Sequence, residues 1–138
     1  MKHYLSIFFA TLLFVSCAHK TIPVAAVKND LSGIWQIVSV NGVNVVKKDA
    51  GKELPYLEFN IEKNTVTGTT GCNRLNGMAT ISNNSINFGP IATTMMMCPN
   101  AQYERPILQA LIGNLSYTYE QGIITISKEG RNIMTLGK

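Results

Sequence analysis

Histidine is almost missing from this chain. Its two histidines, His3 and His19, both lie within the first twenty residues. Nucleophilic hydrolases and transferases need a base beside the nucleophile, and histidine is the usual one. The rest of the sequence therefore excludes a histidine-based triad. The carboxylates offer no clear substitute, because they are scattered without a spacing that suggests acid–base work: Glu58, Glu62, Glu104, Glu120 and Glu129.

Charge is also scarce. Asp, Glu, Lys and Arg together make up 14% of the chain, and the formal net charge is +4. The basic residues are scattered except for Lys47-Lys48, which we interpret as a solvated turn, and no basic stripe alternates with aromatic residues. Nucleic-acid binding usually needs such a stripe. Gly71 and Gly77 do not frame a helix start with a lysine, as a phosphate loop requires. We expect no nucleic-acid partner and no cofactor.

The sequence lacks an apolar run of the roughly 20 residues that span a bilayer. Its one apolar leader, Leu5–Val15, follows the charged Lys2 and precedes Ser16-Cys17. This arrangement is typical of a bacterial lipoprotein signal, in which a peptidase cuts before the cysteine and the thiol then carries lipid. The alternatives are a plain secretion signal and a cytosolic chain with an apolar start.

The lipoprotein interpretation divides the chain into three parts. We predict a signal peptide over residues 1–16, a lipidated Cys17 with a flexible tether over residues 17–30, and one domain over residues 31–138. Two or more acyl chains anchor a protein stably, so the membrane is the first expected partner, reached through Cys17. We expect the protein at the outer membrane or another membrane facing the periplasm of a Gram-negative cell.

The cysteine count is odd, and lipidation of Cys17 accounts for that. It leaves Cys72 and Cys98 on the oxidising side of the membrane, where a disulfide is the favoured state. The alternatives are a reactive dithiol and two free buried thiols. A reactive thiol needs a nearby cation or helix start. Because Cys98 precedes a predicted helix, the dithiol alternative stays open.

The predicted domain consists mostly of strands. Apolar and polar residues alternate best over residues 34–40, 56–61 and 115–119. β-Branched and apolar residues predict further strands over residues 65–70 and 91–97. About eight short strands at this spacing favour a mainly β, α+β fold: a small antiparallel barrel-like sheet with one covering helix.

Turn, bulge and helix signals lie between the predicted strands. Asn41-Gly42 between apolar runs predicts a hairpin. Two glycines and two asparagines over residues 71–77 predict a bulge or an irregular crossing. A helix is expected from Pro99-Asn100 to Gly113, with its apolar stripe at Ile107, Leu108, Leu111 and Ile112. Pro106 would either kink this helix or begin a second segment at its first turn.

Two motifs carry a family resemblance. The segment TGCNRLNG at residues 70–77, followed by TMMMCPN at residues 94–100, resembles the META domain, and more closely the HslJ-type heat-inducible lipoproteins of Gram-negative bacteria. Trp35 before a Val-Asn-Gly turn and the step Phe88-Gly89-Pro90 are also similar. The resemblance covers nearly all of the chain from Leu31 onward. It implies a small β-rich domain with one helix, and a role in envelope tolerance of heat and of antibiotics such as novobiocin. It implies no catalytic residues.

The first motif supplies the candidate partner contact, Asn73, Arg74 and Asn76. One interpretation is an exposed surface for a partner protein or an anionic group. The favoured alternative is structural: both asparagines hydrogen-bond their own backbone in a turn, and Arg74 pairs locally, for instance with Glu104.

The remaining unusual side chains also have two interpretations. Met95, Met96 and Met97 could bind copper, but we expect core packing, because Met95 and Met97 would share one strand face while Met96 takes the other. We expect no metal. Aromatic residues could line a lipophilic cavity, although in a barrel of about eight strands we expect them to fill the core: Trp35, Phe59, Phe88, Tyr117 and Tyr119.

The sequence therefore predicts a membrane-anchored, non-enzymatic envelope lipoprotein domain. We expect a monomer that binds or shields something at the membrane surface under stress, with a protein of the envelope as its second partner. The alternatives are a small barrel that carries an apolar ligand and a thiol–disulfide enzyme.

Overall fold

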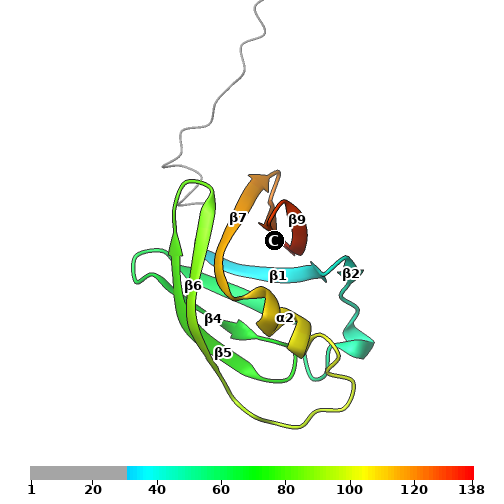
Figure 1. Ribbon diagram of the computed structural model, residues 1–138. Coiled ribbons are helices and arrows are strands. Elements are labelled where there is room, and N and C mark those ends of the chain that lie inside the picture. The colour runs from blue at the N-terminus through cyan, green and yellow to red at the C-terminus, as the bar shows by residue number, and fades with distance from the viewer. Residues whose placement is uncertain (1–30) are drawn as a thin grey trace, which may run out of the picture.

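The computed structural model describes residues 31–138 (Figure 1), so the signal predicted over 1–16 and the tether over 17–30 lie outside the described residues. The strands are β1 (Gly33–Val40), β2 (Val43–Asn44), β3 (Tyr56–Asn60), β4 (Thr65–Thr69), β5 (Arg74–Ile81), β6 (Ser85–Thr93), β7 (Gly113–Glu120), β8 (Ile123–Lys128) and β9 (Arg131–Gly137). The helices are the 3-10 helix η1 (Lys47–Asp49) and the α-helix α2 (Glu104–Ala110). Within the described residues, neither helix has the length and apolar character that crossing a membrane requires.

The strands form one closed antiparallel sheet. Neighbours follow chain order from β3 to β9, and β1 pairs with both β3 and β9, which closes the barrel. The ninth strand, β2, pairs only with the end of β1. The predicted mainly β barrel with one helix is therefore confirmed, with eight strands in the barrel and one additional strand.

Three tight turns connect neighbouring strands at residues 41–42, 121–122 and 129–130. Each has positive φ at both positions, for example 48° at Asn41 and 78° at Gly42. Two-residue hairpins favour this conformation because its twist matches that of the flanking strands. The hairpin predicted at Asn41-Gly42 is confirmed, since β1 and β2 pair across it.

Aromatic and aliphatic side chains fill the barrel interior. Trp35 is 0% exposed and meets Tyr119 edge-on, with ring centroids 6.0 Å apart. Phe59 and Phe88 are tilted against each other at 6.4 Å. Burial of one large apolar side chain contributes about 1.5–3 kcal/mol to stability. The expectation that these aromatics form core is confirmed for the four that are almost fully buried, which include Tyr117, and Tyr119 packs partly buried against them.

Helix α2 closes one end of the barrel. The predicted apolar stripe is confirmed in part: Ile107 and Leu111 are buried in the core and Leu108 is partly buried, but Ile112 is 58% exposed. Just before the helix, the Tyr103 hydroxyl donates to the Asn44 carbonyl oxygen at 3.1 Å and accepts from the Val46 N–H at 3.2 Å. These contacts fasten the start of the helix to the end of β2.

The helix begins later than the sequence predicted. Asn100 has a left-handed φ of 59°, so the chain turns there and becomes α-helical only at Glu104. Pro106 is the third helical residue, and the N–H groups of the first turn have no partner within a helix. The alternative in which Pro106 lies in a first turn is therefore confirmed, and the longer helix from residue 99 is wrong.

The burial of Tyr117 predicts that the stability of the barrel depends on pH in the alkaline range. Its buried hydroxyl donates to the Ser82 carbonyl oxygen at 3.1 Å, and burial raises the pKa of Tyr117 above its ordinary 10.0. A raised folded-state pKa gives a contribution that is complete below the unfolded pKa and is lost as pH rises through the folded one.

We expect urea denaturation to show a loss of stability that sets in near the unfolded pKa, about pH 10, and grows above it, and that Tyr117→Phe reduces. Tyr56→Phe, at a partly exposed position, is the variant with which Tyr117→Phe is compared. An unchanged alkaline loss in Tyr117→Phe would contradict this assignment.

Candidate functional site

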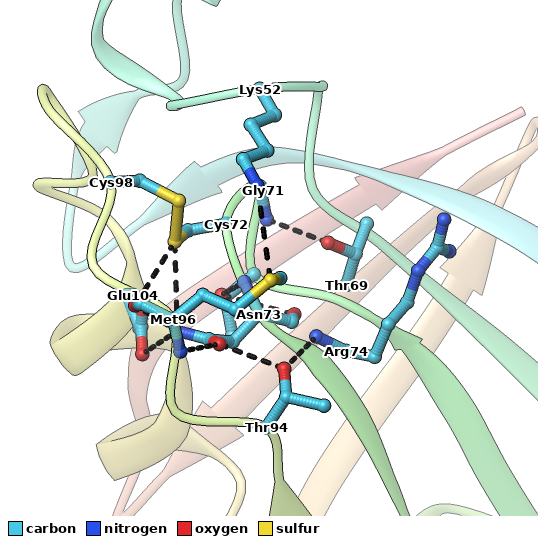
Figure 2. The surroundings of a disulfide bond; sticks show 11 residues. Lys52, Thr69, Gly71, Cys72, Asn73, Arg74, Thr94, Met96, Cys98 and Glu104 are labelled. Atoms are coloured by element: carbon cyan, nitrogen blue, oxygen red, sulfur yellow. Dashed lines mark hydrogen bonds between the residues drawn. A yellow bond between two sulfur atoms is a disulfide. The ribbon is translucent and has the colours of Figure 1, made fainter.

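The two motif segments meet at one end of the barrel. Residues 70–73 form the turn between β4 and β5, and residues 94–98 form the first part of the long loop after β6. A disulfide joins Cys72 to Cys98, with Cα atoms 5.9 Å apart and a sequence separation of 26 (Figure 2). Cys72 is only 4% exposed. The disulfide therefore fixes the loop to the turn through a buried cysteine.

Asn73 is the centre of the polar contacts between these segments. Its side chain is buried, and Oδ1 accepts hydrogen bonds from Thr94 Oγ1 and from the Met96 N–H, both at 2.7 Å. Its Nδ2 donates to the Met96 carbonyl oxygen at 3.1 Å and to Glu104 Oε1 at 2.8 Å (Figure 2). One amide side chain thus connects the turn, the loop and the first residue of α2.

This position corrects two expectations about Asn73. At 1% exposure it cannot be a surface contact for a partner. Its side chain also does not bond the backbone of its own turn: Oδ1 and Nδ2 both reach the opposite loop, and the contact of Nδ2 within the turn is with the Cys72 sulfur, at 3.6 Å. Buried amides are found where every donor and acceptor can be satisfied, and within residues 31–138 each buried side-chain nitrogen and oxygen has a hydrogen-bond partner.

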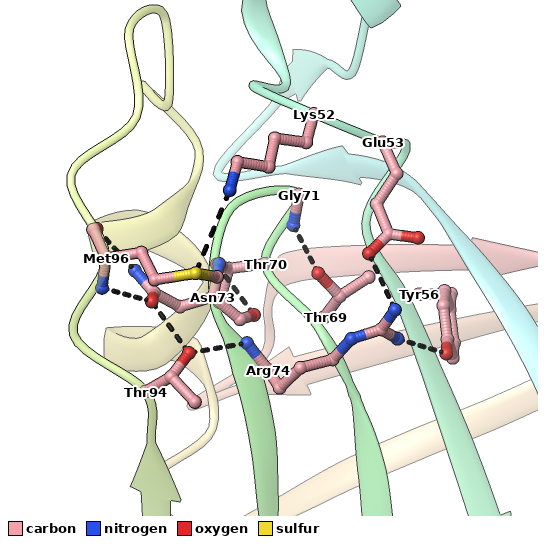
Figure 3. A network of polar contacts seen from close by, with 10 residues as sticks. All are labelled: Lys52, Glu53, Tyr56, Thr69, Thr70, Gly71, Asn73, Arg74, Thr94 and Met96. Atoms are coloured by element: carbon pink, nitrogen blue, oxygen red, sulfur yellow. Dashed lines mark hydrogen bonds and ion pairs between the residues drawn. The ribbon is translucent and has the colours of Figure 1, made fainter.

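Threonines build the turn itself. The Thr70 N–H donates to the Asn73 carbonyl oxygen at 2.9 Å, and the Asn73 N–H donates to Thr70 Oγ1 at 3.1 Å. Thr69 Oγ1 accepts from the Gly71 N–H at 3.0 Å (Figure 3). The irregular stretch is therefore shorter than predicted: β5 is already paired with β4 at Arg74, and the bulge comes later, where the register with β6 shifts after Gly77.

Gly71 brings a third segment to this end of the barrel. Its carbonyl oxygen accepts hydrogen bonds from the backbone N–H groups of Lys52, at 2.9 Å, and Glu53, at 3.1 Å. Its φ is +97°, and a Cβ there would lie 2.0 Å from the Ala50 carbonyl oxygen. Only glycine fits this turn without a shift of the backbone.

Arg74 lies outside the buried contacts, and its side chain is 59% exposed. Nη2 is 3.2 Å from Glu53 Oε1, and Nη1 donates to the Tyr56 hydroxyl at 2.9 Å (Figure 3). The pairing suggested with Glu104 is wrong, because Glu104 bonds Asn73 instead. Asn76 is exposed on the same outward face of β5. Arg74 and Asn76 are thus both exposed on β5, whereas Asn73 is buried beside them.

The methionines are the largest departure from expectation. Met95 is 96% exposed, Met97 is 100% exposed and Met96 is 43% exposed, so the predicted core packing is wrong. The strand expected over residues 91–97 ends at Thr93, because the backbone of Met96 bonds Asn73 rather than another strand. Lys52 Nζ donates to Met96 Sδ at 3.8 Å. We call residues 94–98 the methionine loop.

The disulfide should contribute strongly to stability. Closing a loop of this length is worth about 3.5 kcal/mol on the chain-entropy model. We expect Cys72→Ala/Cys98→Ala to lower the free energy of unfolding in urea by about this amount, and dithiothreitol to have the same effect on the wild type but none on the variant. A change below about 1 kcal/mol would show that the hydrogen bonds of Asn73 are sufficient to hold the methionine loop.

Comparison with known proteins finds one family that includes both the fold and the two motifs. A family model described as the META domain matches residues 29–138. The chain belongs to the META domain family. The match covers every residue of the barrel, α2 and the methionine loop, and it confirms the resemblance that the two motifs carry.

Two solved structures resemble this META domain. One, described only as an NMR structure of the protein, is 25% identical, covers 78% of this chain and 89% of its own, and has a TM-score of 0.61. An NMR structure of a protein from Burkholderia xenovorans is 21% identical, covers 99% and 97% of the two chains, and also has a TM-score of 0.61. The second likeness shows the fold alone. No curated protein matches the chain.

Sequence reasoning missed the role of two side chains of this site. Thr94 stands in the second motif and Glu104 was suggested as a partner of Arg74, but the sequence did not indicate that both bond Asn73. A partial signal was available for Glu104, because acidic residues are favoured in the first turn of a helix. Thr94 could be found only from the fold, since its partner is 21 residues away.

Proposed function

We propose that this META domain is a non-enzymatic binding module of the bacterial cell envelope, and that the methionine loop is part of its contact surface. The observation that carries the proposal is the exposure of Met95 and Met97 on a loop fixed by a disulfide and by Asn73. A constrained loop loses little conformational entropy when it binds. Methionine side chains adapt to irregular apolar partners.

Membrane anchoring is the second part of the proposal. Its support is the leader sequence that ends at Ser16-Cys17, which is typical of lipoproteins. Acyl chains on Cys17 would hold the domain at the outer membrane or at another membrane facing the periplasm. A role in tolerance of heat or antibiotics rests on the resemblance to HslJ-type lipoproteins.

The two alternative functions have less support. In a carrier of apolar ligands the interior aromatics would surround a cavity, whereas Trp35 and Phe59 are packed against other rings. A thiol–disulfide enzyme needs an accessible sulfur. Cys72 is buried, which argues against that chemistry. The sequence after His19 also offers no histidine as a base.

The contact surface is tested by crosslinking in cells before and after heat stress. We expect Met95→Ser/Met97→Ser to lose most crosslinks to its partner while it stays in the membrane fraction. Ile34→Ser/Ile123→Ser removes two other exposed apolar side chains, 52% and 40% exposed, and should retain the crosslinks. Equal crosslinking by both variants would refute the methionine loop as a contact surface.

The anchor is tested separately by intact mass and fractionation. We expect the wild-type chain to begin at an acylated Cys17 and to sediment with membranes, and Cys17→Ala to lose the acyl mass and the membrane association. An unprocessed leader without acylation would refute the anchoring part of the proposal.

A further inference from the structure

Half of strand β6 has an open edge. Along its length β6 pairs with β5, and this pairing includes Ile91 and Thr93. On its other side β7 pairs only with residues 85–88, because β7 begins beside Phe88 at Gly113. Figure 1 shows that β6 continues beyond its pairing with β7, whereas the chain that leads into β7 comes from α2 and does not run beside β6. Within residues 31–138, no strand covers this side of residues 89–93.

The backbone groups at this edge can be assigned by alternation. The Thr94 N–H donates to the Arg74 carbonyl oxygen of β5, and the Pro90 carbonyl oxygen lies against Gly77 of β5. In an antiparallel strand the N–H and C=O of each residue point to the same side, and the side alternates along the chain. The N–H and C=O groups of Ile91 and Thr93 therefore point away from β5, toward the open edge.

An apolar groove runs along this edge. Its volume is about 450 Å³, and it lies between β6 and the helical segment. Its lining includes Phe88, Pro90 and Ile91 on the strand side and Leu108, Leu111 and Ile112 on the helix side. Ile112 is 58% exposed at the rim. The groove thus offers unpaired main-chain groups on one wall and apolar side chains on both.

We propose that this groove binds an extended peptide segment with alternating apolar side chains, which adds to β6 as a strand. Strand addition takes its affinity from main-chain hydrogen bonds and its selectivity from pockets for alternate side chains. A lipid tail or a small apolar molecule would fill the groove but leave the N–H groups of Ile91 and Thr93 unpaired. A second copy paired through the same edge would bring its own α2 against this one. A peptide can both pair with the main-chain groups of β6 and cover the apolar side chains on the two walls.

This inference deepens the proposed function, because it rests on the domain being a binding module and names a class of partner. The groove also adjoins the methionine loop, since Thr93 lines it and residue 94 begins the loop. A segment longer than the groove would therefore reach the exposed methionines. Main-chain hydrogen bonds do not depend on the sequence of the peptide, and methionine side chains adapt to different apolar surfaces. Together they favour partners of varied sequence.

The test uses the full chain in lipid nanodiscs and a blocked octapeptide of alternating valine and threonine, flanked by lysines. We expect saturable binding in fluorescence anisotropy, with the largest amide NMR shifts at Ile91 and Thr93. The matched control is the same peptide N-methylated at alternate residues, which removes main-chain donors. We expect it to bind at least roughly tenfold more weakly, as loss of such hydrogen bonds implies.

Two variants test the two walls of the groove. Thr93→Pro removes an N–H that faces the groove and has no strand partner there, and Ile112→Glu places a charge at the apolar rim. Each should weaken peptide binding roughly tenfold or more without a change in melting temperature. Ile123→Glu, on β8, is the matched control and should bind like the wild type.

Four outcomes would overturn the inference. Equal binding of the N-methylated peptide would show that the groove binds apolar side chains without main-chain pairing, which is not strand addition. Competition by a fatty acid, with no shift at Ile91 and Thr93, would assign the groove to a lipid. Dimerisation that Thr93→Pro abolishes would assign the edge to a second copy. If the groove variants retain crosslinks that the methionine-loop variant loses, the proposed function stands and this inference fails.

Discussion

Asn73→Asp should lower the free energy of unfolding by about 4–5 kcal/mol. The substitution keeps the shape of the side chain but replaces Nδ2, which donates to the Met96 carbonyl oxygen and to Glu104 Oε1. A buried carboxylate would then face two acceptors, one of them on an acidic side chain. Urea denaturation at neutral pH measures the effect, and the deficit should shrink in acid, where a protonated carboxyl can donate again.

The sequence itself supplies the matched control. Asn76 belongs to the same motif but is exposed on β5, so Asn76→Asp should change stability by no more than about 0.5 kcal/mol. The same chemical change at two asparagines three residues apart therefore separates the buried contact from surface charge. Similar losses at both positions would contradict the central role given to Asn73.

Gly71→Ala is expected to destabilise the protein by about 4 kcal/mol, through strain at positive φ and through overpacking. The added Cβ would lie 2.0 Å from the Ala50 carbonyl oxygen and 3.0 Å from that of Glu53, and backbone atoms cannot move aside cheaply. The hydrogen bonds from Lys52 and Glu53 to Gly71 would be displaced with them.

Gly42→Ala separates the two causes. Gly42 also has a positive φ, +78°, but no heavy atom lies within 4 Å of the added Cβ. Its loss should be limited to the conformational penalty, about 1–2 kcal/mol. If Gly71→Ala loses no more than Gly42→Ala in urea denaturation, the close approach between the turn and residues 50–53 is not a constraint on this site.

The barrel could be predicted because its signals are local. A hairpin depends on its turn residues and on alternation in the strands beside it, and Asn41-Gly42 shows both. Even so, β5 begins four residues before the predicted strand at Met78. Glycine and asparagine hid that start, since Asn76 and Gly77 have low strand propensity but pair with β4 in regular register.

The site was hidden because it depends on contacts that composition does not encode. A run of three methionines predicts a core, but residues 94–98 lie on the surface because Asn73 takes up the backbone of Met96. An asparagine in a glycine-rich turn predicts local hydrogen bonds, whereas Asn73 bonds a residue 23 positions away. The groove beside β6 follows only from where β7 begins.

The closure of β1 on β9 has a consequence for how the chain acquires its shape. Gln36 of β1 pairs with Gly137, the last residue of β9. The ribosome adds these two residues at opposite ends of the synthesis of the domain, so the ring of strands cannot close before β9 has been made. Until then both outer strands expose unpaired edges that invite wrong partners. Removal of the last seven residues, which include all of β9 except its first residue, would leave the nascent chain permanently in that vulnerable form.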